Sequence, residues 1–358
     1  MGIEMVEKSV DLKVVPQRRV IPVGVDDGYR NCKVVFRVPD GEIREVVIPS
    51  RARAGAHGVI QMGDSAEVGD TSYEVEGEAF TIGRHLPQHV ETRFPGYHTS
   101  GINRAIIHHA LRVAGLGEED VSVCAGLPFG DYYVGGRPNR ELIDQKTRNL
   151  LGVCATQDVP GCATVRAAQV MAQGVAAFLD SYLGNPSEGA NISEAGPVGV
   201  VDIGGGTTDC VVVLPPLQID SGRGGTVAVG MLDVYGRVDS AMRSKFSLSS
   251  VPQEMISHAV LRGRVRLYGR DEDVSDMARN ALEEVAPEIL RAIQRTFGQA
   301  LDLDRIIVVG GGAEVFAPLL QSAYPQVRVG PRPLTANARG MLLYHERFAR
   351  GGDHGERT

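Results

Sequence analysis

The sequence predicts an α/β protein whose two related halves face each other across a cleft. Two segments carry this prediction: residues 25–36, VDDGYRNCKVVF, and residues 201–212, VDIGGGTTDCVV. Each places an Asp at the end of an apolar strand, a Gly two residues later, and another apolar strand after a short polar turn. One offset aligns Asp26 with Asp202 and also aligns the two glycines. Such an internal repeat indicates two copies of one supersecondary unit, and 358 residues are enough for about two domains.

The first half is predicted to alternate strands with helices. Runs rich in Val and Ile predict strands over 21–27, 33–38 and 44–49, with a small β-containing insertion over about 40–95. Apolar residues at spacings of three and four predict a helix over 100–114, which Gly115 ends. A strand over 121–128, a polar helix over 139–150 and one long helix over 163–184 are expected to follow. The Ala and Gly content of the long helix favours close packing against other backbone.

The second half begins after the most linker-like segment of the chain, NPSEGANISEAGP at 185–197. Strands are expected over 199–206, 209–214 and 225–231, and helices over about 234–246, 253–267 and 275–299. A strand over 305–311, a helix from about 313 and a closing helix over 337–348 complete the pattern.

Composition and charge exclude several functional classes. The net charge of −7 and the absence of Trp argue against direct nucleic-acid binding. Five scattered cysteines without a Cys-x-x-Cys pair indicate reduced thiols in a cytoplasmic protein and argue against a zinc site. Neither a signal peptide nor an apolar run of membrane-spanning length is recognised. The pair His108-His109 is interpreted as structural packing, and the Arg-rich stretch 262–270 as a solvated helix face.

The two strand–turn–strand segments suggest a site for a nucleoside triphosphate and its metal. Turns rich in Gly, Thr or Asn expose successive backbone N–H groups that bind anions. An Asp at the strand end suits Mg²⁺, which needs one or two carboxylates, and Lys33 can make a charge-assisted bond to a phosphate. Taken alone, the first segment could be a plain hairpin. A strand follows each turn, which excludes a Walker P-loop or a Rossmann turn.

A third glycine run, RIIVVGGGAE at 305–314, passes from a strand into a helix. Its amides could approach the α-phosphate or sugar of a nucleotide, although a tight βα turn explains the run equally well.

The three glycine runs, in this order, resemble the actin/Hsp70/hexokinase superfamily, and within it the plasmid-segregation actins called ParM or StbA. The closest segments are VDDGYRNCK, AIIHHALRVAGLGEEDVSVCAGLPFGDYY, VVDIGGGTTD, VVGGGAEVF and NARGMLLY. The resemblance implies an actin-like fold of two RNase H-like domains with a nucleotide cleft between them. Domain I would span 20–184, with a small subdomain at about 40–95, and would be completed by 332–349. Domain II would span 198–331, an N-terminal arm 1–19, and a flexible tail 350–358.

The resemblance also implies roles for individual residues. Asp26 and Asp202 would hold Mg²⁺ through its waters and count, with Gln169, as the catalytic set. ATP or ADP, with GTP as the alternative, would be bound from one side by Asp27, Gly28, Asn31 and Lys33. The other side would be formed by Gly204, Gly205, Gly206, Thr207 and Thr208, and the adenosine would be bordered by Gly310, Gly311 and Gly312.

Gln169 is the candidate for positioning the attacking water. Plasmid members of the family place a Glu on the helix after the last strand of the first domain, and eukaryotic actin has Gln there. Gln169, in the predicted helix over 163–184, matches this place, and Gln173 is the competing candidate. A Gln orients water by accepting a hydrogen bond but is a poor base.

The function implied is that of an ATPase, or GTPase, that polymerises head to tail into nucleotide-dependent filaments. It would segregate plasmid DNA through a ParR-like adaptor bound to a centromere-like site, without direct contact with nucleic acid or membrane. A small-molecule kinase of the same superfamily is the first alternative, although no motif for its additional carboxylate is found. A bacterial actin with another cytoskeletal role is the second.

Overall fold

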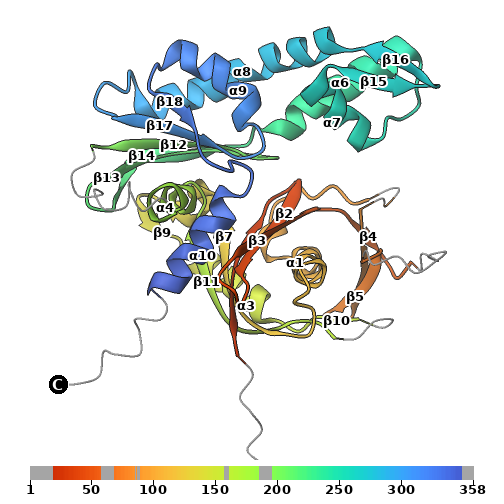
Figure 1. The fold of residues 1–358 in the computed structure, drawn as a ribbon, viewed down its shortest axis with the longest axis vertical. Coiled ribbons are helices and arrows are strands. Elements are labelled where there is room, and N and C mark those ends of the chain that lie inside the picture. The colour runs from red at the N-terminus through yellow and green to blue at the C-terminus, as the bar shows by residue number, and fades with distance from the viewer. Residues whose placement is uncertain are drawn as a thin grey trace, which may run out of the picture.

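The structure is a computed structural model that describes residues 19–57, 68–84, 86, 89–156, 161–184 and 196–348. The expected N-terminal arm and tail, and nearly all of the expected linker, lie outside the described residues. Two α/β bodies are stacked along the long axis of the molecule, with helices α4 (Val175–Leu183) and α10 (Ala336–Phe348) between their sheets (Figure 1).

The first half is built on a five-stranded sheet of order β11-β7-β1-β2-β3. Its strands in chain order are β1 (Ile21–Asp27), β2 (Asn31–Arg37), β3 (Ile43–Pro49), β7 (Asp120–Leu127) and β11 (Thr164–Ala172). Strands β1, β2 and β3 form antiparallel hairpins, whereas β7 and β11 run parallel to β1. Strand β7 is buried along its whole length, as a central strand covered on both faces should be.

The second half repeats this arrangement in the sheet order β14-β13-β12-β17-β18. Its strands are β12 (Val198–Ile203), β13 (Thr208–Leu214), β14 (Gln218–Val227), β17 (Arg305–Val309) and β18 (Val327–Val329). Three antiparallel strands are again followed by two strands parallel to the first. The register repeats as well, because Asp26 lies opposite Lys33 and Asp202 lies opposite Asp209. The internal repeat read from the sequence therefore corresponds to two sheets of the same topology.

A small sheet extends the first half. It has the order β10-β5-β6-β4, from β4 (Ala52–Ala54), β5 (Thr71–Val75), β6 (Glu78–Ile82) and β10 (Ala155–Thr156). Helix α1 (Gly101–Val113) lies between this sheet and strands β2 and β3 (Figure 1). The side chain of Ser100 begins the helix by accepting the backbone N–H of Asn103. The short helices η1 (Tyr97–Thr99) and α2 (Phe129–Tyr132), the pair β8 (Tyr133–Val134) and β9 (Arg137–Pro138), and helix α3 (Arg140–Leu151) complete this half.

Helices α6 (Met231–Phe246), α7 (Gln253–Arg262), α8 (Ser275–Phe297) and α9 (Ala313–Ala323) belong to the second half. Their apolar faces join the inward residues of β12, β13 and β17 in one continuous core. The hairpin of β15 (Arg264–Leu267) and β16 (Arg270–Asp273) lies beside α7.

Close backbone contacts at two glycines bring α10 against the first half. A Cβ on Gly340 would lie 1.7 Å from the carbonyl oxygen of Ala176 in α4, and a Cβ on Gly24 would lie 2.0 Å from that of Ala338. No other residue allows these approaches, because real Cβ atoms do not come within 3.0 Å of backbone atoms. Helix α10 can therefore rest on both α4 and β1.

Two predicted helices are wrong. Residues 163–184 are not one helix: β11 pairs in parallel with β7 up to Ala172, and α4 begins only after Gly174, whose φ of 77° breaks any continuous helix. Pairing with a buried neighbouring strand outweighs the helix propensity of the alanines. Helix α7 ends at Arg262 because Gly263 has a φ of 65°, and the Arg-rich stretch continues as the β15–β16 hairpin instead of a helix face.

Candidate nucleotide site

The three glycine runs converge on one cleft between the two halves. It encloses about 210 Å³ and is bordered by the β1–β2 turn, the β12–β13 turn and the turn from β17 into α9. Most of the predicted site residues line it: Asp26, Gly28, Asn31, Lys33, Asp202, Gly204, Gly205, Gly206, Thr207, Gly310 and Gly311. Four predicted residues, Asp27, Thr208, Gly312 and Gln169, do not line it.

On the first side of the cleft, Lys33 is held by Asp26. Its Nζ donates to Asp26 Oδ2 at 2.9 Å, and its side chain is only 11% exposed. Burial pulls the pKa of Lys33 down, but the adjacent Asp26 carboxylate outweighs burial and raises it overall. The ammonium is therefore kept charged at the place where a phosphate would lie. Ser50 steadies the turn by donating its hydroxyl to the carbonyl of Gly28 at 2.7 Å.

Asp27 points away from the cleft, because successive side chains of a strand face opposite sides of the sheet. Its Oδ2 accepts bonds from Lys146, from Asn103 at 2.6 Å and from His98 at 3.1 Å. Burial alone would raise the pKa of Asp27, but Lys146 and His98 lower it to about 2. This fully buried group anchors the β1–β2 turn to α1 and α3. Its assignment as a nucleotide ligand is therefore not supported by its position.

On the second side, the β12–β13 turn is closed by its own backbone and by the start of α6. The N–H of Gly204 donates to the carbonyl of Thr207 at 2.8 Å, and the N–H of Met231 donates to the carbonyl of Gly204 at 3.0 Å. A Cβ on Gly205 would lie 2.7 Å from the Cβ of Arg30, and one on Gly206 would lie 2.6 Å from the ring of Tyr29. The glycines therefore let this turn touch the first turn across the cleft.

Two other predicted ligands have structural roles. The hydroxyl of Thr208 is buried and donates to the carbonyl of Val229 at 2.8 Å. Gly312 donates its N–H to the carbonyl of Ile203 at 2.9 Å, and a Cβ there would lie 2.5 Å from the side chain of Ile203. Gly312 thus serves the close approach of α9 to β12 rather than a ligand.

Asp202 is the central acidic group of the cleft. Burial, followed by the neighbouring carboxylate of Asp26, raises the pKa of Asp202 to about 6 against the lowering effects of Asn337 and Lys33. Asn337, the second residue of α10, donates to Asp202 Oδ2 at 2.5 Å and accepts the N–H of Gly174 at 3.0 Å. Asp209, beside Asp202 in the register, has a pKa raised to about 7 by burial and by Asp202.

These charges fit a divalent cation. Lys33 and Arg30 both line the cleft, and Lys33 is paired with the carboxylate of Asp26. Burial and the nearby carboxylate of Asp26 raise the pKa of Asp202, and a bound cation would stabilise its charged form. Mg²⁺ prefers oxygen ligands and keeps several waters, so the two carboxylates are a suitable donor set.

Gln173, not Gln169, lies in the cleft. Its amide donates to Asp26 Oδ1 at 2.9 Å, and the side chain is buried in the turn just before α4. Gln169 lies on β11, where its Oε1 faces Nδ1 of His345 at 3.1 Å, and it lines a separate groove. Its expected place on a helix is wrong because that segment is a strand.

Sequence reasoning missed several residues that border the cleft, one of them within the first phosphate loop and the others outside the loops. The guanidinium of Arg30 stacks on the ring of Tyr235 at 3.9 Å and donates to Ser257 Oγ at 2.5 Å. Its buried Nη1 has no hydrogen-bond partner within the described part of the chain. Arg30 stands inside the VDDGYRNCK loop, and a basic residue in an anion-binding turn was the available signal. Nothing local marks Tyr235, Ser257 or Asn337, which reach the cleft through the fold.

Side chains also bridge the two halves beside the cleft. Arg93 Nη1 lies 3.0 Å from Asp233 Oδ1, and Arg51 Nε donates to Gln253 Oε1 at 2.9 Å. Because these contacts join the first half to α6 and α7, they stabilise the present spacing of the two halves.

Within the described residues, no helix is long and apolar enough to cross a membrane. No curated protein sequence matches the chain significantly. A family model described as the N-terminal part of the plasmid segregation protein ParM matches residues 21–182, and one described as the C-terminal part of archaeal MreB-like actin homologues matches residues 200–322.

Solved structures resemble the whole molecule. The archaeal actin homologue Ta0583 has a TM-score of 0.71 at 19% identity, covering 92% of this chain and 100% of its own, and it is also solved in complex with ADP. ParM from a 15-stranded filament of Clostridium botulinum has a TM-score of 0.73 at 17% identity, covering 92% of this chain and 99% of its own. A non-polymerisable quadruple mutant of pCBH ParM has the same TM-score and identity. These likenesses show the actin-like fold, and the family models agree with it: the first half of the chain matches the ParM model and the second half matches the model of archaeal MreB-like actin homologues.

Proposed function

We propose that this protein binds and hydrolyses a nucleoside triphosphate in the cleft and uses it to control its own assembly into filaments. The observation that carries the proposal is the convergence of both strand–turn–strand loops on one cleft that holds Lys33 and two buried carboxylates. The ParM filament and the ADP complex among the similar structures support it at the level of the fold.

The chain's own groups suggest a division of labour. Lys33 and the amides of residues 204–206 would bind the phosphates, and Asp26 and Asp202 would hold Mg²⁺ through its waters. The metal would neutralise charge that develops on the phosphates. Gln173 would orient the attacking water, as its place beside Asp26 allows. Hydrolysis then depends mainly on positioning and electrostatic stabilisation, as is general for phosphoryl transfer.

Nucleotide binding would act on assembly by favouring one spacing of the two halves. A ligand bound by both turns stabilises the form in which the two halves lie close together, because it binds that form more tightly. The contacts Arg93–Asp233 and Arg51–Gln253 stabilise the same form. A head-to-tail interface does not close on itself and therefore gives open polymers.

The cellular role that we propose is plasmid segregation in the cytoplasm, with a ParR-like adaptor joining the filament to a centromere-like DNA site. The match to the ParM family model supports this role. The net charge of −7 favours an indirect link to DNA, because direct binding would require positive charge to replace counterions.

The test combines polymer and phosphate measurements on the full chain. We expect light scattering and pelleting to rise with Mg²⁺ and ATP or GTP but not with ADP, and phosphate release to follow. Gln173→Ala should slow release and prolong the polymers, while Gln169→Ala should behave like the unmodified protein. Flat scattering across salt and protein concentration would contradict filament formation, and phosphate transfer to a sugar acceptor would favour the kinase alternative. Two further assays would distinguish plasmid segregation from another cytoskeletal role: co-pelleting of an adaptor protein with the filaments, and the rate of plasmid loss in cells.

A further inference from the structure

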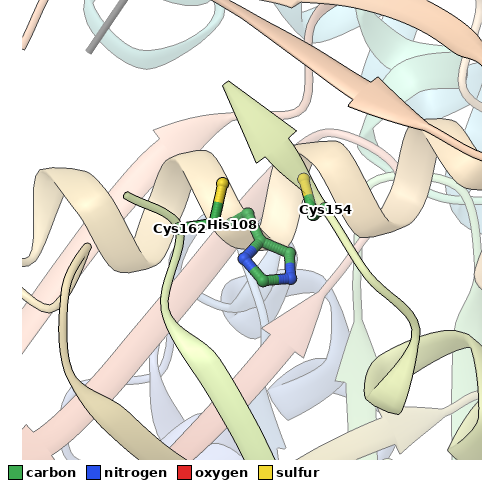
Figure 2. Close-up of side chains that lie close together, drawn as sticks. All are labelled: His108, Cys154 and Cys162. Atoms are coloured by element: carbon green, nitrogen blue, oxygen red, sulfur yellow. The ribbon is translucent and has the colours of Figure 1, made fainter. Parts of the chain in front are cut away.

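Three side chains with soft metal-binding atoms meet at the edge of the first half, away from the nucleotide cleft. They are His108 on α1, Cys154 just before β10, and Cys162 just before β11 (Figure 2). One ligand atom from each lies within 4.8 Å of the other two. His108 and Cys154 are buried, and Cys162 is half-buried. The three residues come from separate segments, so their spacing in the sequence gave no sign of the cluster.

His108 is an unexplained polar group at the centre of this cluster. His108 is 4% exposed, and neither of its ring nitrogens has a hydrogen-bond partner among the described residues. The next residue on the helix is different, since Nδ1 of His109 lies 3.1 Å from the hydroxyl of Tyr73. An unpaired buried polar group destabilises the fold, because it loses its hydrogen bonds to water. Coordination of a cation by one ring nitrogen would remove part of that cost.

The cluster offers two thiols and one imidazole, all from described residues. A thiolate beside a neutral imidazole is the donor type that Zn²⁺ prefers.

We propose that His108, Cys154 and Cys162 form a Zn²⁺ site, with the fourth position taken by water on the exposed side of Cys162. Zn–S bonds of about 2.3 Å and Zn–N bonds of about 2.0–2.1 Å place tetrahedral ligand atoms about 3.5–3.8 Å apart. Because the ligand atoms lie within 4.8 Å of one another, the present arrangement needs a contraction of at most about 1.3 Å. Binding releases the thiol protons to solvent, and two thiolates balance the charge of the ion.

A disulfide between Cys154 and Cys162 is the competing chemistry. It would leave His108 without a partner, and it would require an external oxidant to accept two electrons. The zinc site accounts for all three side chains and involves no change of oxidation state. Cys154 and Cys162 are both free thiols in the structure.

The site would fasten the small sheet to the main sheet. Cys154 leads directly into β10, which pairs with β5, and Cys162 leads into β11, which pairs with β7. Helix α1 packs against the small sheet and carries His108. A single ion held by all three segments would therefore resist separation of β10 from α1.

Cobalt is the most direct probe, because tetrahedral thiolate coordination of Co²⁺ gives strong charge-transfer and visible absorption, whereas octahedral oxygen coordination does not. Bound metal is removed from the 358-residue chain with a chelator, the thiols are kept reduced, and the protein is titrated with Co²⁺ in the absence of nucleotide. We expect the bands to saturate at one equivalent and to be displaced by Zn²⁺, and the melting temperature to rise with Zn²⁺. No thiolate bands in the unmodified protein would overturn the proposal, and this measurement needs no variant.

Variants then identify the ligands. Cys154→Ser, Cys162→Ser and His108→Gln should each lower Zn²⁺ affinity by more than about 100-fold, since changes to outer-shell partners alone cost 10- to 100-fold. Cys210→Ala, which alters a buried thiol of the second half, is the matched control and should retain both bands and affinity. Unchanged affinity in the Cys154/Cys162 double variant would overturn the site, as would a disulfide between these two cysteines that persists in reducing buffer.

Discussion

Replacing Lys146 by Met tests whether the buried ion pair behind the first phosphate loop stabilises the fold. Lys146 and Asp27 are both fully buried and bonded to each other. The pKa of Asp27 falls from 3.8 to about 2 in the folded protein. At about 1.4 kcal/mol per pKa unit, this contributes about 2–3 kcal/mol of stability. Because the folded pKa is lowered, that contribution is fully present above about pH 4 and is lost as the pH falls towards 2.

Lys146→Met leaves the carboxylate buried with only its neutral donors and His98. Breaking a buried pair on one side costs about 3–5 kcal/mol, so we expect urea unfolding at pH 7 to show a loss of that size. Burial is the largest influence on Asp27 and acts to raise its pKa. The variant should therefore lose less stability at pH 5 than at pH 8, because protonation relieves the isolated charge.

The double variant Asp27→Asn/Lys146→Met should recover most of the loss, since an amide can still accept bonds from His98 and Asn103. Arg279→Met, which removes an exposed pair with Asp276, is the control and should change stability by less than about 0.5 kcal/mol. A Lys146→Met protein within 1 kcal/mol of the unmodified protein, or a double variant no more stable than the single one, would refute this reasoning.

Three further predictions follow from the cleft and from α10. Gln173→Ala should lower the rate of phosphate release by about 100-fold, as expected for a group that positions the reacting water. The control, Gln169→Ala, should stay within twofold of the unmodified enzyme. Equal rates for the Gln173 variant and the unmodified enzyme in a single-turnover assay would exclude Gln173 from that role. Gly340→Ala should destabilise the protein by about 3 kcal/mol or more, because its Cβ would collide with the carbonyl of Ala176. Gly236→Ala in α6 meets nothing within 4 Å and should stabilise by about 0.5–1 kcal/mol. Similar stabilisation of both variants in thermal unfolding would show that α4 and α10 separate freely. Arg93→Ala should weaken nucleotide affinity by no more than about fivefold in a fluorescence titration. The reason is that the ion pair with Asp233 is partly exposed and worth at most about 1 kcal/mol. A 100-fold loss of affinity would mean that Arg93 contacts the nucleotide itself.

The topology was largely predictable because the repeat around Asp26 and Asp202 encodes both sheets and their shared register. The prediction failed over residues 163–172, where Ala-rich helix propensity masks an edge strand that only its pairing with β7 defines. The same failure misplaced Gln169.

For the site, the opposite orientation of Asp26 and Asp27 follows from the alternation of side chains along a strand, so the sequence already held that information. The places of Asn337 and Tyr235 in the cleft could not be predicted from the sequence, because their partners there, Asp202 and Arg30, are distant in sequence.

The two copies of the internal repeat differ in charge at one aligned position in the strand that follows each turn. The two sheets coincide in order and register, yet the first carries an ammonium at Lys33 where the second carries a carboxylate at Asp209. The approximate twofold symmetry of the backbone is therefore broken by charge. Of this aligned pair Lys33 lines the cleft, whereas Asp209 accepts hydrogen bonds from Phe129 and Thr226. An anionic ligand between the two turns is therefore attracted by the ammonium on the first-half side of the pair. The cleft has a built-in direction, and every subunit in a row of identical copies would point its ligand the same way.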